Sequence, residues 1–376
     1  MDIPRELEKT ILKKLKPNKV VAILGARRVG KTELISAISK NISEKQLWLN
    51  GDDIETHNLL AIQSTANFKR LLGDTQVLII DEAQEIPNIG KKLKLMVDTI
   101  PEIKVLITGS SAFEINNQVG EPLLGRMSTL HLYPIAQMEF SKQENYLATK
   151  SNLEERLIFG SYPELSNITN KDDKIAYLKE LAHNQLLRDI LAFEGIKKRD
   201  KIVALLQMIA FRTGSEISLE GLGRDLQISK NTVEKYLDLF SKVFIIYSVS
   251  GFSRNRDNEI TKMKKWFFVD NGIRNAIINS FNPINMRDDI GKLWENYLNS
   301  ERIKALHYKE KHVLDYFWRT HNKQEIDRIE DINENLSAFE YKWKSLKTKI
   351  PTEFAKAYPN ASFEVIDQDN YLDFIT

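Results

Sequence analysis

The sequence lacks cysteine altogether: none of its 376 residues is Cys, which excludes a disulfide framework and any metal site built from thiolates. It also lacks an apolar run near the length of a membrane span, and its start carries no basic and apolar leader pattern. We therefore expect a cytoplasmic protein with no membrane partner.

The chain also has little excess of either charge, because 54 Lys and Arg residues nearly balance 52 Asp and Glu residues and leave a formal net charge of +2. Any surface that binds nucleic acid must then be a local patch rather than a bias of the whole chain. The hydrophobic content of 42% and the charged content of 28% are typical of a globular protein, and the length predicts two or three domains.

The most specific motif is the segment from Gly25 to Thr32, which fits the phosphate-binding P-loop pattern. An apolar, β-branched run over 20–24 precedes it and an amphipathic helical pattern over 33–40 follows it, which disfavours a chance glycine-rich turn. In such a loop, backbone N–H groups surround phosphates, and the helix N-terminus adds the positive end of its dipole.

The motif predicts a nucleotide-binding role for each of its residues. We expect Lys31 to reach the β- and γ-phosphates and the Thr32 hydroxyl to ligate Mg²⁺. The predicted nucleotide-binding residues are Gly25, Ala26, Arg27, Arg28, Val29, Gly30, Lys31, Thr32 and Glu33.

A second apolar strand over 77–80 ends in Asp81 and Glu82. Asp81 is in the place where a P-loop NTPase holds a carboxylate beside Mg²⁺, and Glu82 can orient or deprotonate the attacking water. Gln84 is a weaker candidate for the same work. The alternative is an ordinary acidic helix N-terminus, where carboxylates are favoured by the dipole.

A third strand, over 104–108, ends just before Gly109, Ser110 and Ser111. Polar residues at this edge lie where open α/β sheets bind ligands, so Ser110 or Thr108 can sense the γ-phosphate or hold the attacking water. The alternative, favoured most for Ser111, is a helix N-cap.

The spacing of the other elements predicts the fold class. Strands are expected over 46–49 and 129–133, and helices over 3–15, 59–72 and 89–100. Strands that alternate with helices form a parallel sheet with helices on both faces. We therefore predict an α/β P-loop nucleotide domain over 1–145.

The region 146–275 is predicted to be a helical and winged-helix domain. A short helix over 219–226, a turn, a helix over 230–240 and a β-rich run over 243–247 are typical of a winged helix-turn-helix. In the DNA-reading case four side chains would face the groove, and in the alternative case the region is a packing module. Those four are Lys230, Asn231, Thr232 and Lys235.

The region 276–376 holds a second candidate site. Glu295 lies on a predicted helix, Asp327 on one strand, and Glu340 and Lys342 on another, where residues two apart share a face. Three carboxylates bind Mg²⁺ through oxygen, and a nearby lysine can stabilise charge while a phosphodiester is cut. The alternative is a Glu–Lys pair on a solvated face.

The order of these motifs resembles bacterial and archaeal AAA-like ATPases that join a P-loop core to a winged helix and a C-terminal restriction-endonuclease-like domain. The resemblance implies ATP as the nucleotide, an additional strand between the two Walker strands, and Glu82 as the catalytic glutamate. The segments that carry it are 25–32, 79–84, 106–111, 124–126, 132–134, 266–272, 293–296, 317–319, 325–327 and 339–342.

Arg126 resembles the Gly-Arg position of this family. The resemblance implies that it touches the γ-phosphate, either within its own chain or from a neighbouring subunit, and the second case needs a homo-oligomer. A plain surface ion pair is the alternative.

The nuclease signature is matched by Asp327, Glu340 and Lys342, with Glu295 upstream. Arg328 stands where the family has an apolar residue, and Trp343 stands where a smaller one is common, so the pocket is expected to be reshaped.

Two functions fit this sequence. In the first, ATP hydrolysis is coupled to DNA binding or to Mg²⁺-dependent cleavage. In the second, the chain is a nucleotide-dependent switch or scaffold for a protein partner, and its nuclease-like domain is inactive.

Overall fold

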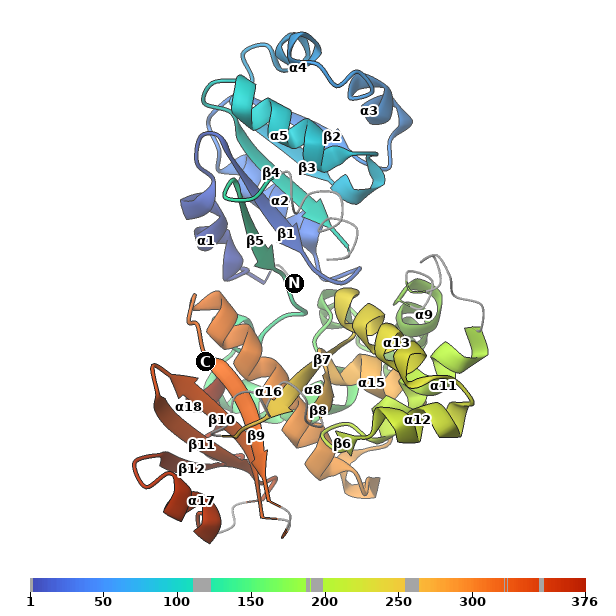
Figure 1. Cartoon of the computed structure of the whole chain (residues 1–376), viewed down its shortest axis with the longest axis vertical. Coiled ribbons are helices and arrows are strands. Elements are labelled where there is room, and N and C mark those ends of the chain that lie inside the picture. Colours follow the sequence, from blue (N-terminus) through green and yellow to red (C-terminus); the bar gives the residue numbers. More distant parts are fainter. Residues whose placement is uncertain are drawn as a thin grey trace. The chain divides into compact units, whose positions relative to one another are not determined.

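The structure is a computed structural model of the whole chain (Figure 1). It describes residues 3–110, 123–186, 190, 199–253, 264–320, 322, 324–344 and 348–376, apart from the side chains of 184–186. The chain divides into two compact units. The N-terminal unit comprises Pro4–Pro134 and Lys242–Phe244, and the C-terminal unit comprises Ile135–Ser241 and Ile245–Thr376 together with Ile3.

The N-terminal unit is built on a parallel five-stranded sheet of order β2-β3-β4-β1-β5. β4 lies between the strand that leads into the P-loop and the strand that ends in Asp81, as the family resemblance predicted. The strands are β1 (Lys19–Leu24), β2 (Gln46–Asn50), β3 (Val77–Asp81), β4 (Lys104–Gly109) and β5 (Met127–His131).

Helices cover both faces of this sheet (Figure 1), which confirms the predicted fold class. On β1, Val20 and Ala22 belong to one apolar cluster with α4 and α5, while the alternate residues Val21 and Ile23 are also fully buried. Burial on both faces explains why these strands read as continuous apolar runs. The helices are α1 (Leu7–Lys14), α2 (Lys31–Lys40), α3 (Ile54–Leu59), α4 (Thr65–Leu72), α5 (Ile89–Thr99) and the 3-10 turn η1 (Ala83–Glu85).

Several predicted elements differ in their bounds, and the helix expected over 3–15 begins only at Leu7. The helix expected over 59–72 is the shorter α4, which begins at Thr65 because the Ser64 hydroxyl accepts from the Asn67 N–H, whereas α3 ends at Leu59. The strand expected over 129–133 begins two residues earlier, since Met127 already pairs with Val20.

The C-terminal unit begins with helices and ends with a mixed sheet (Figure 1). In the described part of the chain, no helix has both the length and the apolarity needed to cross a bilayer. The helical elements are α7 (Gln137–Phe140), α8 (Tyr146–Phe159), η2 (Pro163–Ser166), α9 (Lys171–Glu180), the π-helical η3 (Leu181–Leu186), α11 (Arg199–Phe211), α12 (Leu219–Leu226), α13 (Lys230–Lys242), α15 (Asn271–Ile277), η4 (Ile284–Met286), α16 (Ile290–Tyr308), α17 (Thr352–Ala357) and α18 (Tyr371–Ile375).

A single sheet of order β12-β11-β10-β9-β7-β8-β6 runs through this unit. β7 pairs in parallel with β9, so strands from the predicted second and third regions share one ladder. The three-domain division at 145 and 275 stays a prediction. The strands are β6 (Glu216–Ile217), β7 (Ile246–Gly251), β8 (Lys264–Phe268), β9 (Leu314–Arg319), β10 (Glu325–Ile332), β11 (Asn335–Tyr341) and β12 (Ser362–Ile366).

The predicted pair of short helices is present as α12 and α13. Gln227 ends α12 in the left-handed conformation, and the Ser229 hydroxyl accepts a hydrogen bond from the Thr232 N–H at the start of α13. The β-rich run expected over 243–247 is β7, which begins at Ile246, and β8 lies between β7 and β6.

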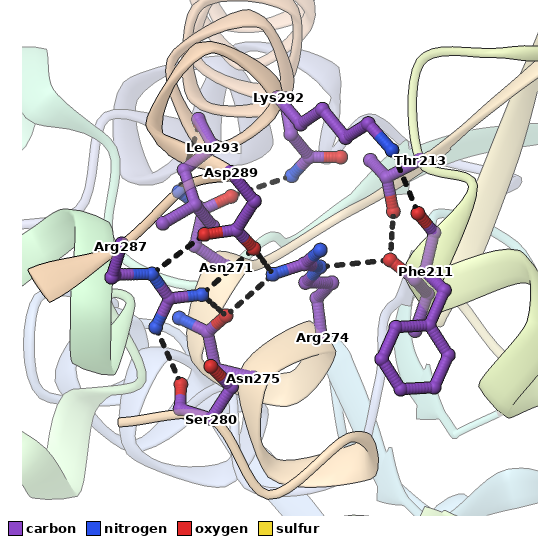
Figure 2. Close-up of polar contacts among 12 residues, drawn as sticks. Phe211, Thr213, Asn271, Arg274, Asn275, Ser280, Arg287, Asp289, Lys292 and Leu293 are labelled. Atoms are coloured by element: carbon purple, nitrogen blue, oxygen red, sulfur yellow. Dashed lines mark hydrogen bonds and ion pairs between the residues drawn. The ribbon is translucent and has the colours of Figure 1, made fainter. Parts of the chain in front are cut away.

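A buried polar network holds α15 to its neighbours, as Figure 2 shows. The Arg274 guanidinium donates to the Ala210 carbonyl at the end of α11, to Asn275 and to Asp289. Arg287 donates to both carboxylate oxygens of Asp289 at 2.8 and 2.9 Å. Because Asp289 directly precedes α16 and Arg274 contacts α11, the Arg274–Asp289 pair links three helices.

Candidate functional sites: a P-loop and a buried carboxylate cluster

The P-loop has a backbone that few residues can adopt. Arg28 and Gly30 have φ angles of 64° and 92°, in the left-handed region that favours glycine. At Gly25, an added Cβ would lie 2.2 Å from the Leu132 carbonyl oxygen, so no side chain fits there. Glycine is therefore favoured at position 30 by the backbone conformation and required at position 25 by the lack of space for a side chain.

Lys31 is the first residue of α2 and is buried against the loop. Its Nζ donates to the carbonyl oxygens of Gly25 and Ala26, each at 3.1 Å. The ammonium thus lies across the loop that the motif assigns to phosphates.

Thr32 and Asp81, predicted to share a metal ion, are in direct contact. The Thr32 hydroxyl donates to Asp81 Oδ2 at 2.7 Å, and the other carboxylate oxygen accepts from the Thr108 hydroxyl. Mg²⁺ binds oxygens at about 2.1 Å in an octahedron, so two neighbouring ligands lie about 3 Å apart. The separation of these two oxygens therefore fits one Mg²⁺ ion.

Glu82 follows Asp81 in an uncommon backbone conformation, with a φ of 47°. Its N–H donates to the Thr108 hydroxyl at 2.9 Å. Its carboxylate accepts from Gln84 Nε2 at 2.6 Å, and the same nitrogen lies 3.3 Å from the Ser110 hydroxyl. Gln84 thus joins the two residues that the sequence assigned to the γ-phosphate side.

Gly51, at the end of β2, shows how closely this edge is packed. An added Cβ at Gly51 would lie 2.1 Å from the Glu82 carbonyl oxygen. The backbone of Glu82 is therefore held between neighbouring strands. Ser111 lies outside the described residues.

Arg126 is not near the P-loop within its own chain. Its carbonyl accepts from the Val20 N–H at the start of β1, whereas the loop follows Leu24 at the other end, about 13 Å away at ~3.3 Å per residue. Its side chain, 41% exposed, pairs with Asp98 at 2.5 Å. Of the alternatives left open for Arg126, this position disfavours contact with its own γ-phosphate and fits the surface ion pair, and a role in trans stays a prediction.

The second candidate site is centred on a lysine that the sequence analysis missed. Lys265, on β8, is 2% exposed, and its Nζ lies 2.6 Å from Glu325 Oε1 and 3.1 Å from Glu295 Oε1. The same nitrogen lies 5.3 Å from the centre of the Phe317 ring, within reach of a cation–π interaction. β8 is buried on both faces from Lys265 to Phe268, so the alternation of residues along the strand did not single out Lys265.

Asp327 joins this group because of an irregularity in β10. The register with β9 shifts between Ile326 and Ile329, which is a β-bulge that can re-aim side chains. Asp327 Oδ2 accepts from the Tyr341 N–H at 2.8 Å. The next residue, Arg328, is buried and donates to Glu330 and to Asn299 of α16, so its departure from the family pattern serves a separate charge network.

Glu340 and Lys342 form an ion pair of 2.6 Å. The Glu340 side chain is only 14% exposed, so the pair does not lie on the solvated face that the alternative required. Trp343 packs against Trp294 of α16, with ring centres 5.4 Å apart.

Electrostatics show that these residues form one group, which we call the carboxylate cluster: Glu295, Glu325, Asp327 and Glu340 with Lys265 and Lys342. Burial raises the pKa of Glu295 to about 8, against the opposing effect of Lys265, and the charge of Asp327 raises it further. Burial also raises the pKa values of Asp327 and Glu340. The nearby carboxylates raise the pKa of Lys265 despite its burial.

The structure thus brings together all four predicted residues of this site but does not arrange them as a metal centre. In the part of the chain that the structure describes, no three His, Cys, Asp or Glu side chains are placed to hold a metal ion. The prediction of a three-carboxylate Mg²⁺ site is corrected, because the Lys265 ammonium lies between Glu295 and Glu325.

The candidate DNA-reading helix α13 carries little net positive charge. Lys230 pairs with Glu220 of α12 at 2.7 Å, which raises the pKa of Lys230. Asn231 and Lys235 are exposed, but so are Glu234 and Asp238 on the same helix, while Thr232 is half-buried. A role in reading DNA stays a prediction.

Three family models match successive parts of the chain. Residues 17–141 match a model described as an AAA domain. Residues 150–283 match a domain of unknown function (DUF8612), and residues 290–373 match another (DUF4143). Residues 17–141 are therefore similar to AAA domains.

Curated relatives span most of the chain. Protein MJ1544 of Methanocaldococcus jannaschii is 25% identical over 391 residues, which cover 95% of this chain and 86% of that protein. Protein Rv2008c of Mycobacterium tuberculosis is 24% identical over 328 residues, which cover 86% of this chain and 70% of that protein. Both are named as uncharacterized.

Solved structures give weaker likenesses. A signal transduction ATPase with numerous domains from Pyrococcus horikoshii has a TM-score of 0.32 and 15% identity, covering 82% of this chain and 47% of that one. This chain therefore spans about half of that protein. A RuvB variant from Thermotoga maritima has a TM-score of 0.34 and 15% identity, covering 65% of this chain and 89% of that one.

Proposed function

We propose that this chain binds ATP with Mg²⁺ and hydrolyses its γ-phosphate. The observation that carries the proposal is the hydrogen bond of 2.7 Å between Thr32 and Asp81, directly beside the P-loop. A hydroxyl and a carboxylate in contact at the edge of the sheet are the pair that would hold Mg²⁺, which neutralises phosphate charge when bound. The match of residues 17–141 to an AAA domain supports the same reading.

Each residue of the site has a distinct task in this proposal. The loop amides and Lys31 bind and orient the phosphates, and the lysine exchanges its carbonyl partners for phosphate oxygens. Glu82 orients a water molecule and draws away its proton as the water attacks phosphorus, so that ADP and phosphate leave. Gln84 positions the Glu82 carboxylate through a hydrogen bond, and Ser110, which contacts the same Gln84 nitrogen, lies on the side where the γ-phosphate would bind.

The decisive experiment separates binding from turnover. We expect Lys31→Ala to lose ATP binding, measured by calorimetry, because the loop then lacks its fixed cation. We expect Glu82→Gln to bind ATP but to lower kcat by about 10²-fold or more, since a general base contributes ~10²–10⁴-fold.

Lys40→Ala is the matched control, because Lys40 is an exposed lysine at the other end of the same helix. It should leave both binding and kcat unchanged. Normal turnover in Glu82→Gln would remove Glu82 from the mechanism, and normal ATP binding in Lys31→Ala would contradict the P-loop assignment.

For the C-terminal unit we propose binding that is coupled to nucleotide state, without cleavage. The ion pairs of Lys265 with Glu295 and Glu325 favour this second function over a Mg²⁺-dependent nuclease. DNA is a candidate partner, supported by the α12–α13 pair, two helices joined by a short turn as in DNA-binding helix-turn-helix motifs. A protein partner is the alternative, supported by the Lys230–Glu220 pair and the mixed charges of α13.

A salt series separates these partners. The affinity of the chain for DNA is measured with ATP and without it. If DNA is the partner, this affinity should fall steeply as the salt concentration rises, because contacts with phosphates release counterions. Lys235→Glu should weaken that binding, whereas Asp238→Ala should not. Absence of salt-dependent binding to duplex and single-stranded DNA would favour the protein partner.

A further inference from the structure

The family resemblance implies a divalent metal in the carboxylate cluster, and the geometry disagrees. We propose that Lys265 is a built-in cation that replaces this metal, so that the cluster binds neither Mg²⁺ nor Mn²⁺. The inference deepens the second half of the proposed function, in which the C-terminal unit binds without cutting. It is independent of the P-loop.

The first argument is space. Nζ of Lys265 lies 2.6 and 3.1 Å from one oxygen each of Glu325 and Glu295. A divalent ion held by the same oxygens would lie about 2.1 Å from each, in the volume that the ammonium fills. Gly214 packs near the other oxygen of Glu295, where an added Cβ would lie 2.5 Å from Oε2, so no side chain fits there.

The second argument is charge. A divalent ion would bring two positive charges to the buried carboxylates. Lys265 supplies one of them permanently. Lys342 supplies a second positive charge at the edge of the cluster, where its Nζ lies 2.6 Å from Glu340 Oε1. Two ammonium groups thus bring the charge that one divalent ion would bring.

The third argument is that the cation and the carboxylates come from two different segments of the chain. Lys265 lies on β8, in the segment that matches the DUF8612 model, whereas Glu295 and Glu325 lie in the segment that matches the DUF4143 model. A strand from the preceding segment therefore carries the cation that balances the carboxylates of the following one. The shared sheet holds the cation in register, since β7 pairs with both β8 and β9.

The test begins with the wild-type cluster. Mn²⁺ binding is measured by electron paramagnetic resonance without nucleotide, in an Asp81→Asn background that removes the carboxylate of the P-loop site. We expect the amount of bound Mn²⁺ to stay the same when Asp327→Asn is added, because the cluster holds no ion that this substitution could release. A bound ion that disappears with Asp327→Asn would overturn the proposal, whether or not the chain hydrolyses ATP.

The reciprocal test removes the cation. In the same background, Lys265→Met should create a Mn²⁺ site that is lost again on adding Glu325→Gln, and Lys265→Arg should create none. Lys304→Met is the matched control, because Lys304 is also 2% exposed and pairs with a buried carboxylate, Glu301, at 2.7 Å. If Lys265→Met folds but binds no additional Mn²⁺, the proposal is contradicted. If this variant does not fold, the measurement on the wild-type cluster decides.

Discussion

At the scale of single residues, Gln84 is the side chain whose position says most about the P-loop site. Its Nε2 bridges Glu82 and Ser110, while its Oε1 is buried and has no hydrogen-bond partner among the described residues. A buried acceptor without a donor is costly, and it is expected to gain a partner when the site is filled. A water molecule beside Glu82 would supply that donor.

We therefore predict that Gln84→Leu lowers kcat by about tenfold or more, a part of the ~10²–10⁴-fold that a general base contributes, with little change in the Kd for ATP. Steady-state turnover and calorimetric titration measure the two quantities. Gln63→Leu is the control, because Gln63 is an exposed glutamine of the same unit and should keep normal turnover. A weakened Kd with normal kcat would show that Gln84 acts in nucleotide binding instead.

At the scale of elements, the network in Figure 2 explains how the helices of the C-terminal unit are fixed. Asp289 accepts from Arg274 and Arg287, and both arginines are buried. Removing one partner of a buried ion pair leaves an uncompensated charge, and that loss usually exceeds the net contribution of the intact pair. The junction of α11, α15 and α16 should therefore depend on this carboxylate.

We predict that Asp289→Ala lowers the free energy of unfolding by about 3–5 kcal/mol, as expected when a buried charge loses its partner. Urea unfolding followed by circular dichroism measures the change. Asp288→Ala, one residue away and exposed, should stay within about 0.5 kcal/mol of the wild type. Equal stability of the two variants would mean that the network contributes little.

At the scale of the whole molecule, the position of Arg126 raises the question of assembly. Arg126 is too far from its own P-loop to reach a bound γ-phosphate, since it precedes β5 at the opposite edge of the sheet. If it acts on ATP at all, it does so in a neighbouring copy of the chain. A homo-oligomer in which each copy completes the next site is the arrangement that this role requires.

We predict that Arg126→Ala binds ATP but turns over at least about tenfold more slowly, as expected for an arginine that stabilises transition-state charge. Mixing Arg126→Ala with Glu82→Gln should restore part of the activity, because some mixed interfaces then contain both intact residues. Turnover of the mixture is the measurement. Wild-type activity in Arg126→Ala alone would reduce this residue to its surface ion pair with Asp98.

Most of the P-loop site could be predicted before folding is considered. Gly25 to Thr32 are contiguous, and their chemistry is local. Contact between Thr32 and Asp81 was also predictable, because the ends of parallel strands meet at one edge of a sheet. The choice between the cis and trans roles of Arg126 could be narrowed on the same grounds, since residues that precede a parallel strand lie at the opposite end of the strands from the P-loop.

The carboxylate cluster could be predicted only in part. Glu295, Asp327, Glu340 and Lys342 were recognised as a family pattern, but Lys265 belongs to a different segment and to no motif. Its partners depend on the shared sheet of β7, β8 and β9 and on the bulge in β10. Such pairings join residues distant in sequence, so local patterns carry no signal for them.

Contiguous residues thus identified the phosphate-binding loop, because its backbone amides and its lysine need only one strand, one turn and one helix. Whether the acidic residues of the C-terminal unit hold a metal ion was decided by folding alone. Burial determines which charges must be neutralised, and strand register determines which cation reaches them. Here that cation is the ammonium of Lys265.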